Sequence, residues 1–214
     1  MPWFPLLAAF ALFASAGTLD WWPGRWCIRA VGLSWLSTVL LLALTRPDLL
    51  RRRSRPADQP ASWDGPVMQR LRIAILALLV VAGLQSGRGH FVLDQRLFAF
   101  GLLVLAAGTL FLWACLHANP FFETEVRHQD DRAQTVIQSG PYRWVRHPGY
   151  VALILLLGSL PWMLHSTYSV LPWLYCVYTL MNRSRCEEDY LNEHLPGYGD
   201  YLKVVRFRFI PWIW

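Results

Sequence analysis

The chain has 214 residues and a mass of 24.7 kDa, the size of one domain or of two small ones. It is 55% hydrophobic and only 16% charged, whereas an average soluble domain is about 25% charged. This composition excludes a disordered tail, a coiled coil and a disulfide-stapled secreted module. The four cysteines form no CxxC pair, so we expect neither a metal site nor a disulfide framework.

Apolar residues gather in six runs along the chain. They cover about residues 2–18, 28–45, 71–86, 97–118, 149–164 and 168–182. The fourth run, 97–118, can cross about 30 Å of hydrocarbon at about 1.5 Å per residue. The second and third runs reach that length when their flanking residues are included. The last two runs are shorter and suit a short helical hairpin. Six such runs leave too little polar sequence to cover them in water. We therefore expect an all-α polytopic membrane bundle of five to six transmembrane helices.

Positive charge is concentrated on one side of this expected bundle. With six spans, residues 46–72, 119–147 and 183–214 share that side and hold sixteen of the twenty Lys and Arg residues. The positive-inside rule then places this side, and both termini, in the cytoplasm.

The segment 46–64 is rich in Arg, Pro and Asp and is predicted to be a loop with little structure. It contains the cationic tract from Arg51 to Arg55, which borders an apolar run. Anionic membrane lipids are the expected partner of this tract, because a nucleic-acid-binding protein would spread its basic residues over a folded polar face.

The sequence from Ser139 to Tyr150 combines a Gly-Pro turn signal with charged and aromatic residues. His147 is biased away from the α region because a proline follows it, and Pro148 suits the first position of a helix. A helix is therefore predicted to begin at Pro148. Its free N–H groups, with Arg143 and Arg146 nearby, predict an anion site, and the alternative is that both arginines bind phospholipid phosphates.

His147 is expected at the boundary between water and lipid, beside a helix N-terminus whose field favours the neutral imidazole. A neutral imidazole can accept a proton or bind a ligand. The alternative is a histidine that only caps the helix.

The sequence from Arg183 to Leu191 follows the sixth apolar run without a break, which predicts a helix that extends out of the bilayer. Arg183 and Glu187 are four residues apart, a spacing that permits an ion pair. Asp189 is predicted on a solvated face. Glu187 or Glu188 is predicted to be buried, because a carboxylate can bind two vicinal ribose hydroxyls.

The C-terminal residues 206–214 begin by alternating arginine with phenylalanine. Period two predicts an extended segment on the membrane face, anchored by its aromatic residues. Arg206 and Arg208 are the two residues for which a role in the site is also open.

Two motifs together resemble the isoprenylcysteine carboxyl methyltransferase family. They are Gly140-Pro141-Tyr142-x-x-Val145-Arg146-His147-Pro148-x-Tyr150 and, after one helical hairpin, Arg183-x-x-x-Glu187-Glu188-x-x-Leu191. The resemblance covers about residues 119–214, whereas the N-terminal hundred residues match only as membrane helices. It divides the chain into an N-terminal transmembrane region, 1–118, and a methyltransferase-like region, 119–214.

The resemblance implies an integral-membrane methyltransferase that uses S-adenosylmethionine, held in a pocket made by a cytosolic C-terminal helix and loops. The resemblance is to bacterial-type members of the family. It therefore implies a location in the bacterial cytoplasmic membrane and a hydrophobic or prenylated acceptor. The cofactor-binding residues that it implies are His147, Pro148, Tyr150, Glu187 and Glu188. We add Tyr142 and Arg146 to the predicted cofactor site, and the predicted catalytic residues are His147, Arg183 and Glu188.

The acceptor decides whether a general base is needed. A carboxylate is ionised at neutral pH and needs none, whereas an amine or hydroxyl would need one, for which His147 is the candidate. Arg183 or Arg206 is a candidate to hold an acidic acceptor head.

Two other functions remain possible from the sequence. A membrane reductase of the sterol-reductase type would use NADPH, whose second nucleotide needs more room and more basic residues. A transporter or scaffold would carry ionisable residues at mid-membrane depth.

Overall fold

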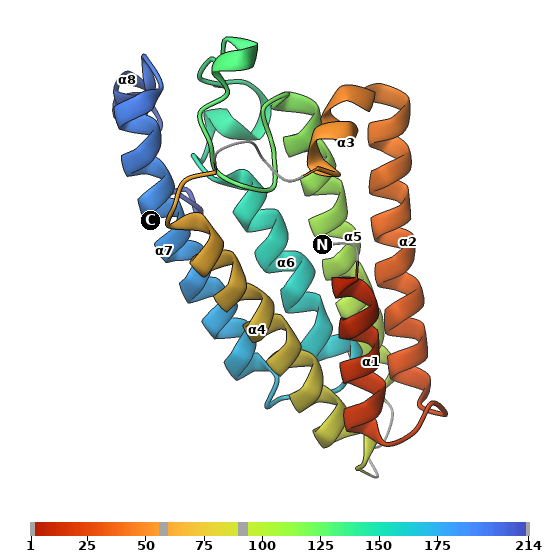
Figure 1. Ribbon diagram of the computed structural model, residues 1–214. Coiled ribbons are helices and arrows are strands. Elements are labelled where there is room, and N and C mark those ends of the chain that lie inside the picture. The colour runs from red at the N-terminus through yellow and green to blue at the C-terminus, as the bar shows by residue number, and fades with distance from the viewer. Residues whose placement is uncertain (1–2, 56–59, 90–93, 213–214) are drawn as a thin grey trace.

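The computed structural model describes residues 3–55, 60–89 and 94–212. Within these residues the protein has eight α-helices and no strand, which confirms the all-α prediction (Figure 1). The helices are α1 (Phe4–Ala16), α2 (Trp22–Thr45), α3 (Pro47–Arg53), α4 (Asp64–Ala82), α5 (Gln95–Ala118), α6 (Pro148–Met163), α7 (Val170–His194) and α8 (Tyr198–Val204). A π-helical turn, Gly83–Gly87, continues α4.

Three helical stretches are long and apolar enough to cross a membrane, so this is an integral membrane protein. They are Trp22–Thr45, Asp64–Gly87 and Gln95–Ala118. The apolar helices α1 and α6 are shorter, with 13 and 16 residues. At about 1.5 Å per residue, α1 covers roughly 20 Å, and in Figure 1 it lies beside only part of α2. The expectation of five to six spans is therefore confirmed for three, and the others stay a prediction.

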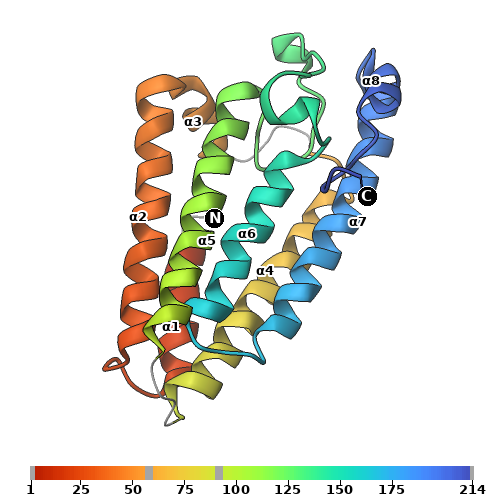
Figure 2. The ribbon, with the colours of Figure 1, turned by 180° about the vertical axis from the view of Figure 1, so that it is seen from behind.

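The long helices pack side by side, with α5 mainly against α6 and α4 mainly against α7 (Figures 1 and 2). One hydrophobic core joins them. It includes Leu12 of α1, Leu78 of α4, Leu105 of α5, Leu157 of α6 and Leu180 of α7. The helices before and after residue 118 thus contribute to the same core.

The segment 46–64, predicted as a loop, contains the helix α3, and this prediction is wrong for residues 47–53. Pro47 stands in the first turn, where its missing N–H costs nothing, together with Asp48. Three arginines occupy the last turn, so the charges at both ends complement the helix dipole. Leu49 is buried and fixes the helix against the bundle. Residues 56–59 of this segment lie outside the described residues.

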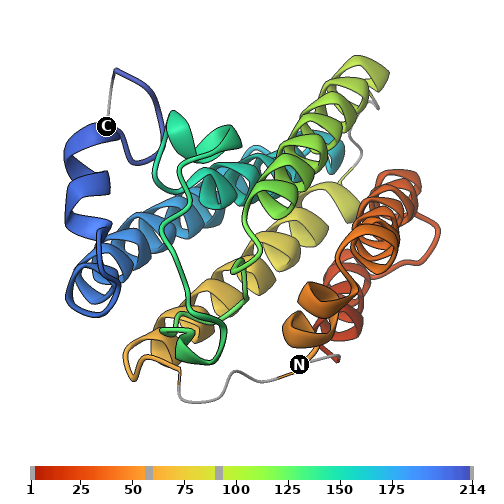
Figure 3. The ribbon, with the colours of Figure 1, turned by 90° about the horizontal axis from the view of Figure 1, so that it is seen from above.

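One end of the bundle is covered by the segment 119–147, by the end of α7 and by α8 (Figure 3). The tail after α8 returns to this end. Its carbonyls at Phe207 and Arg208 accept hydrogen bonds from the amides of Arg146 (2.9 Å) and His147 (3.0 Å). Phe209 is buried in the core, so the predicted anchoring on the membrane face is wrong for this residue. Residues 213–214 lie outside the described part.

Gly101 allows α5 and α6 to approach closely. A Cβ added there would stand 2.9 Å from the Met163 nitrogen and 3.0 Å from the Ser159 oxygen. We expect Gly101→Ala to lower the free energy of unfolding by about 1–3 kcal/mol, because the two backbones must separate. Gly32→Ala in α2 is the control, since that Cβ would meet nothing within 4 Å. Thermal unfolding in detergent checks this, and equal midpoints for both variants would contradict it.

Candidate cofactor pocket

A cavity of about 250 Å³ lies at the end of the bundle where α6 and α7 meet the segment 119–147. Its lining includes Phe122 of that segment, Tyr150 of α6, Glu187 of α7 and Tyr198 of α8. Side chains from four separate parts of the sequence thus face one space.

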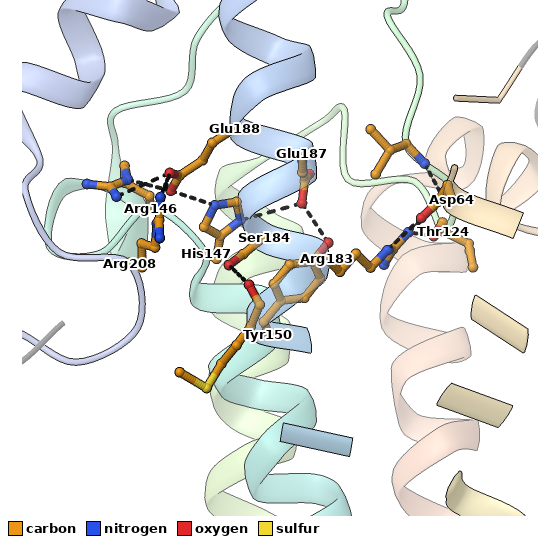
Figure 4. A network of polar contacts seen from close by, with 12 residues as sticks. Asp64, Thr124, Arg146, His147, Tyr150, Arg183, Ser184, Glu187, Glu188 and Arg208 are labelled. Atoms are coloured by element: carbon orange, nitrogen blue, oxygen red, sulfur yellow. Dashed lines mark hydrogen bonds and ion pairs between the residues drawn. The ribbon is translucent and has the colours of Figure 1, made fainter. Parts of the chain in front are cut away.

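His147 lies at the start of α6, which begins at Pro148 as predicted. Its Nε2 is 3.1 Å from an oxygen of Glu188, and its Nδ1 is 3.5 Å from an oxygen of Glu187 (Figure 4). The imidazole is stacked with the Tyr150 ring, with centroids 5.3 Å apart. The two motifs recognised in the sequence therefore meet at this side chain.

Both ring nitrogens of His147 face carboxylate oxygens. Burial by itself lowers the pKa of His147, but the hydrogen bonds and charges of Glu187 and Glu188 outweigh it and raise the pKa above 6.5. The pKa of His147 is therefore shifted towards the charged form, the opposite direction from the one expected for an imidazole beside a helix N-terminus.

Glu188 is buried and bound by three cations. Its oxygens accept from Arg146 Nε at 2.7 Å and from Arg208 Nε at 2.9 Å, and His147 is the third partner. Burial alone would raise the pKa of Glu188, but these partners lower it to about 2. Glu188 does not line the cavity and instead ties α7 to residue 146 and to the tail.

Glu187 lines the cavity. Its Oε2 accepts a hydrogen bond of 2.6 Å from the Tyr150 hydroxyl. Asp189, two residues further along the chain, is exposed as predicted. The three consecutive acids therefore have three different environments: one faces the cavity, one is buried among cations and one faces solvent.

Arg183 does not form the predicted ion pair with Glu187. Its Nε and Nη2 donate to Asp64 at 2.8 and 2.9 Å, and Nη2 also donates to the Thr124 carbonyl at 2.9 Å. Asp64 is 1% exposed and accepts from the Val126 amide as well, at 2.9 Å. Asp64 and Arg183 are far apart in the sequence, but they can pair because α4 begins directly beside α7 (Figure 4).

The structure brings most of the predicted site residues to the cavity. Those that line it are Tyr142, Arg146, His147, Tyr150, Arg183 and Glu187. Pro148 is buried at the first position of α6, and Glu188 stands behind His147.

Two residues of this region were absent from the predicted site, Asp64 and Arg208. An acidic residue at the start of an apolar run, in an otherwise basic segment, was the available signal for Asp64. For Arg208 the signal was the Arg-Phe alternation, which left its role open.

The charges around His147 predict a pH-dependent stability. Because its pKa is raised, the stabilisation is complete below pH 6.5 and is lost as the pH rises through the folded-state pKa. We expect the unfolding midpoint in detergent to fall over this range, and the His147→Gln variant to show a weaker dependence. At the acid end the sign reverses: the contribution of Glu188 is lost as the pH falls from 4.5 towards about 2. An identical pH profile for the wild type and His147→Gln would contradict this assignment.

We expect Asp64→Asn to lower the free energy of unfolding by about 3–5 kcal/mol, because it leaves the buried Arg183 guanidinium without a carboxylate. Asp189→Asn is the matched control, since Asp189 is exposed. Unfolding in detergent measures both. The double variant Asp64→Leu/Arg183→Met should lose less stability than Asp64→Asn, and additive losses would contradict a specific pair.

Residues 99–193 match the model of the Isoprenylcysteine carboxyl methyltransferase (ICMT) family. The match begins inside α5 and contains both motifs that meet at His147, which confirms the resemblance noted in the sequence. No curated protein matches the chain. Members of the family are S-adenosylmethionine-dependent methyltransferases. Residues 99–193 therefore form an isoprenylcysteine carboxyl methyltransferase family domain.

Proposed function

We propose that the protein transfers a methyl group from S-adenosylmethionine to a lipidic or prenylated acceptor at the cytosolic face of the membrane. The observation that carries this proposal is that one cavity joins polar groups at the end of the bundle to apolar side chains deeper between α5 and α6. Tyr142 and Glu187 lie at the polar end, and Leu112, Leu153 and Leu156 line the apolar part. Such a cavity suits a polar donor and a hydrophobic acceptor together.

The lining fits the chemistry of S-adenosylmethionine, which carries a carboxylate, a ribose diol and a methyl group on a positively charged sulfur. The Tyr142 hydroxyl is buried and has no hydrogen-bond partner in the protein, so it is available to a ligand. Glu187 uses Oε2 for Tyr150 and His147, which leaves Oε1 for the diol. Glu187 is therefore the acidic residue we assign to the ribose.

The remaining motif residues hold this arrangement. Arg146 is bound to Glu188 and also donates to the carbonyls of Val205 (2.9 Å) and Arg206 (2.6 Å). His147 and Glu188 thus act as positioning residues that fix the start of α6 against α7. Positioning of this kind supplies much of the rate of an in-line group transfer.

We assign no general-base role to His147, because both ring nitrogens lie within 3.5 Å of carboxylate oxygens of Glu187 and Glu188. The acceptor that fits a site without a base is one whose nucleophile is ionised at neutral pH, such as a carboxylate. An amine or hydroxyl acceptor, for which His147 was the candidate base, fits less well.

The side of the membrane follows from charge. The end of the bundle that holds the cavity also carries α3 with its three arginines and the segment 119–147 with four arginines, so the positive-inside rule, which counts Lys and Arg, assigns it to the cytosol. In this arrangement α6 and the apolar first part of α7 form the membrane hairpin, in addition to the three longer spans.

We expect Glu187→Gln to weaken the binding of S-adenosylhomocysteine by about tenfold or more, because it removes a charged hydrogen-bond acceptor from the cavity. Asp189→Asn removes the same charge from an exposed site two residues away and should bind like the wild type. Titration calorimetry in detergent measures both. Transfer of a radiolabelled methyl group to a total lipid extract should fall in parallel.

The two measurements test different parts of the proposal. Equal affinity of wild type and Glu187→Gln would remove Glu187 from the cofactor site. Label transferred only to water-soluble compounds would contradict a lipidic acceptor.

A further inference from the structure

The described part of the cavity is lined by four arginines, and three of them are paired with carboxylates. These pairs are Arg127 with Glu123 at 2.9 Å, Arg146 with Glu188 at 2.7 Å, and Arg183 with Asp64 at 2.8 Å. Their positive charge is therefore largely compensated within the protein. The fourth arginine, Arg53, is the exception.

Arg53 extends from the last turn of α3 to the cavity. Its Nη1 donates to the Phe122 carbonyl at 2.7 Å, and its guanidinium lies 5.2 Å from the centre of the Phe122 ring. Glu123 is close enough to act on it electrostatically, but both oxygens of Glu123 accept bonds from Arg127. A half-buried guanidinium thus retains donors that no carboxylate among the described residues takes up.

The Tyr142 hydroxyl is a second unsatisfied group in the same cavity. Tyr142 is 7% exposed, its hydroxyl makes no hydrogen bond of standard geometry among the described residues, and it is near enough to Arg53 for an electrostatic interaction. Asn119 is its polar neighbour and acts on the hydroxyl, while the Asn119 side-chain oxygen accepts from the Phe121 amide. A buried hydroxyl without a partner costs free energy, so its presence beside a cation indicates a ligand atom.

The position of Arg53 is fixed through Phe122. A Cβ on Gly149, in the first turn of α6, would overlap the Phe122 ring, so the ring lies directly on the helix start. Arg53 in turn contacts both the ring and the carbonyl of Phe122. The guanidinium is therefore held in place by the same turn of α6 that carries the site, rather than free to leave the cavity.

We propose that the Arg53 guanidinium and the Tyr142 hydroxyl form an anion subsite that binds a carboxylate or phosphate group of a ligand in this cavity. The inference rests on the proposed function, which offers two ligands with this chemistry: the carboxylate of the methyl donor and an anionic head of the acceptor. It assigns a binding role to α3, which lies outside the residues 99–193 that match the family.

The test uses Arg53→Gln and Tyr142→Phe in the full-length protein in detergent. Arg51→Gln is the matched control, because it removes the same charge from the same helix at a side chain that is 75% exposed and whose ion-pair partner within the described residues is Asp48, at 3.7 Å. Tyr142→Phe removes a hydroxyl that makes no hydrogen bond of standard geometry in the described part of the chain, so its unfolding midpoint should equal or exceed that of the wild type. A loss of binding in this variant therefore reports on the ligand and not on the fold.

Two arms distinguish the source of the anion. In the first, S-adenosylhomocysteine is compared with 5′-methylthioadenosine, which lacks the amino-acid part. If the subsite binds the donor's carboxylate, Arg53→Gln and Tyr142→Phe weaken the binding of S-adenosylhomocysteine by about tenfold. The binding of 5′-methylthioadenosine is then unchanged. In the second arm, if the subsite binds the acceptor, both variants retain donor affinity and need about tenfold more lipid extract for half-maximal methyl transfer.

The outcomes separate this inference from the function on which it rests. A wild-type protein that binds no S-adenosylhomocysteine would overturn the proposed function and the subsite with it. A wild type that binds, with both variants equal to Arg51→Gln in both arms, would overturn the subsite alone. Equal weakening of both adenosine compounds would also overturn it, because the effect would then not depend on the anion.

Discussion

The site depends on one buried carboxylate held by two arginines and a histidine. Glu188 on α7 joins Arg146 and His147, just before α6, to Arg208 of the tail. Burying a charge is costly unless it is paired and hydrogen-bonded, and here the partners come from two other parts of the chain. Removing Glu188 would leave these partners without their carboxylate. The arrangement therefore keeps the start of α6, the end of α7 and the tail together, and the cavity exists between them.

A second buried pair has the same effect on the other side of the cavity. Asp64 at the start of α4 binds Arg183 of α7 and the amide of Val126. Because α4 precedes the matched family residues, the N-terminal helices take part in shaping the site as well as in spanning the membrane. The two ion clusters have different roles. Glu188 orients His147, and Asp64 fixes the segment that covers the cavity.

The sequence was sufficient to predict the all-α membrane fold, the start of α6 at Pro148 and the meeting of His147 with Glu187 and Glu188. Apolar run length and proline chemistry act locally, so they can be read without a structure. It was not sufficient for the partner of Arg183, because spacing along one helix says nothing of a carboxylate 119 residues away. The rise in the pKa of His147 was missed for the same reason, since it is caused by groups on another helix. Whether the cavity-lining residues bind the donor stays a prediction.

The return of the tail to residues 146 and 147 has a consequence for biogenesis. During synthesis, α6 and α7 are complete before the tail from Val205 to Phe209 leaves the ribosome. Until then Glu188 lacks Arg208, and the amides of Arg146 and His147 lack the carbonyls that they bind. The polar end formed by α6 and α7 is therefore complete only once residues 205–209 have folded back onto it.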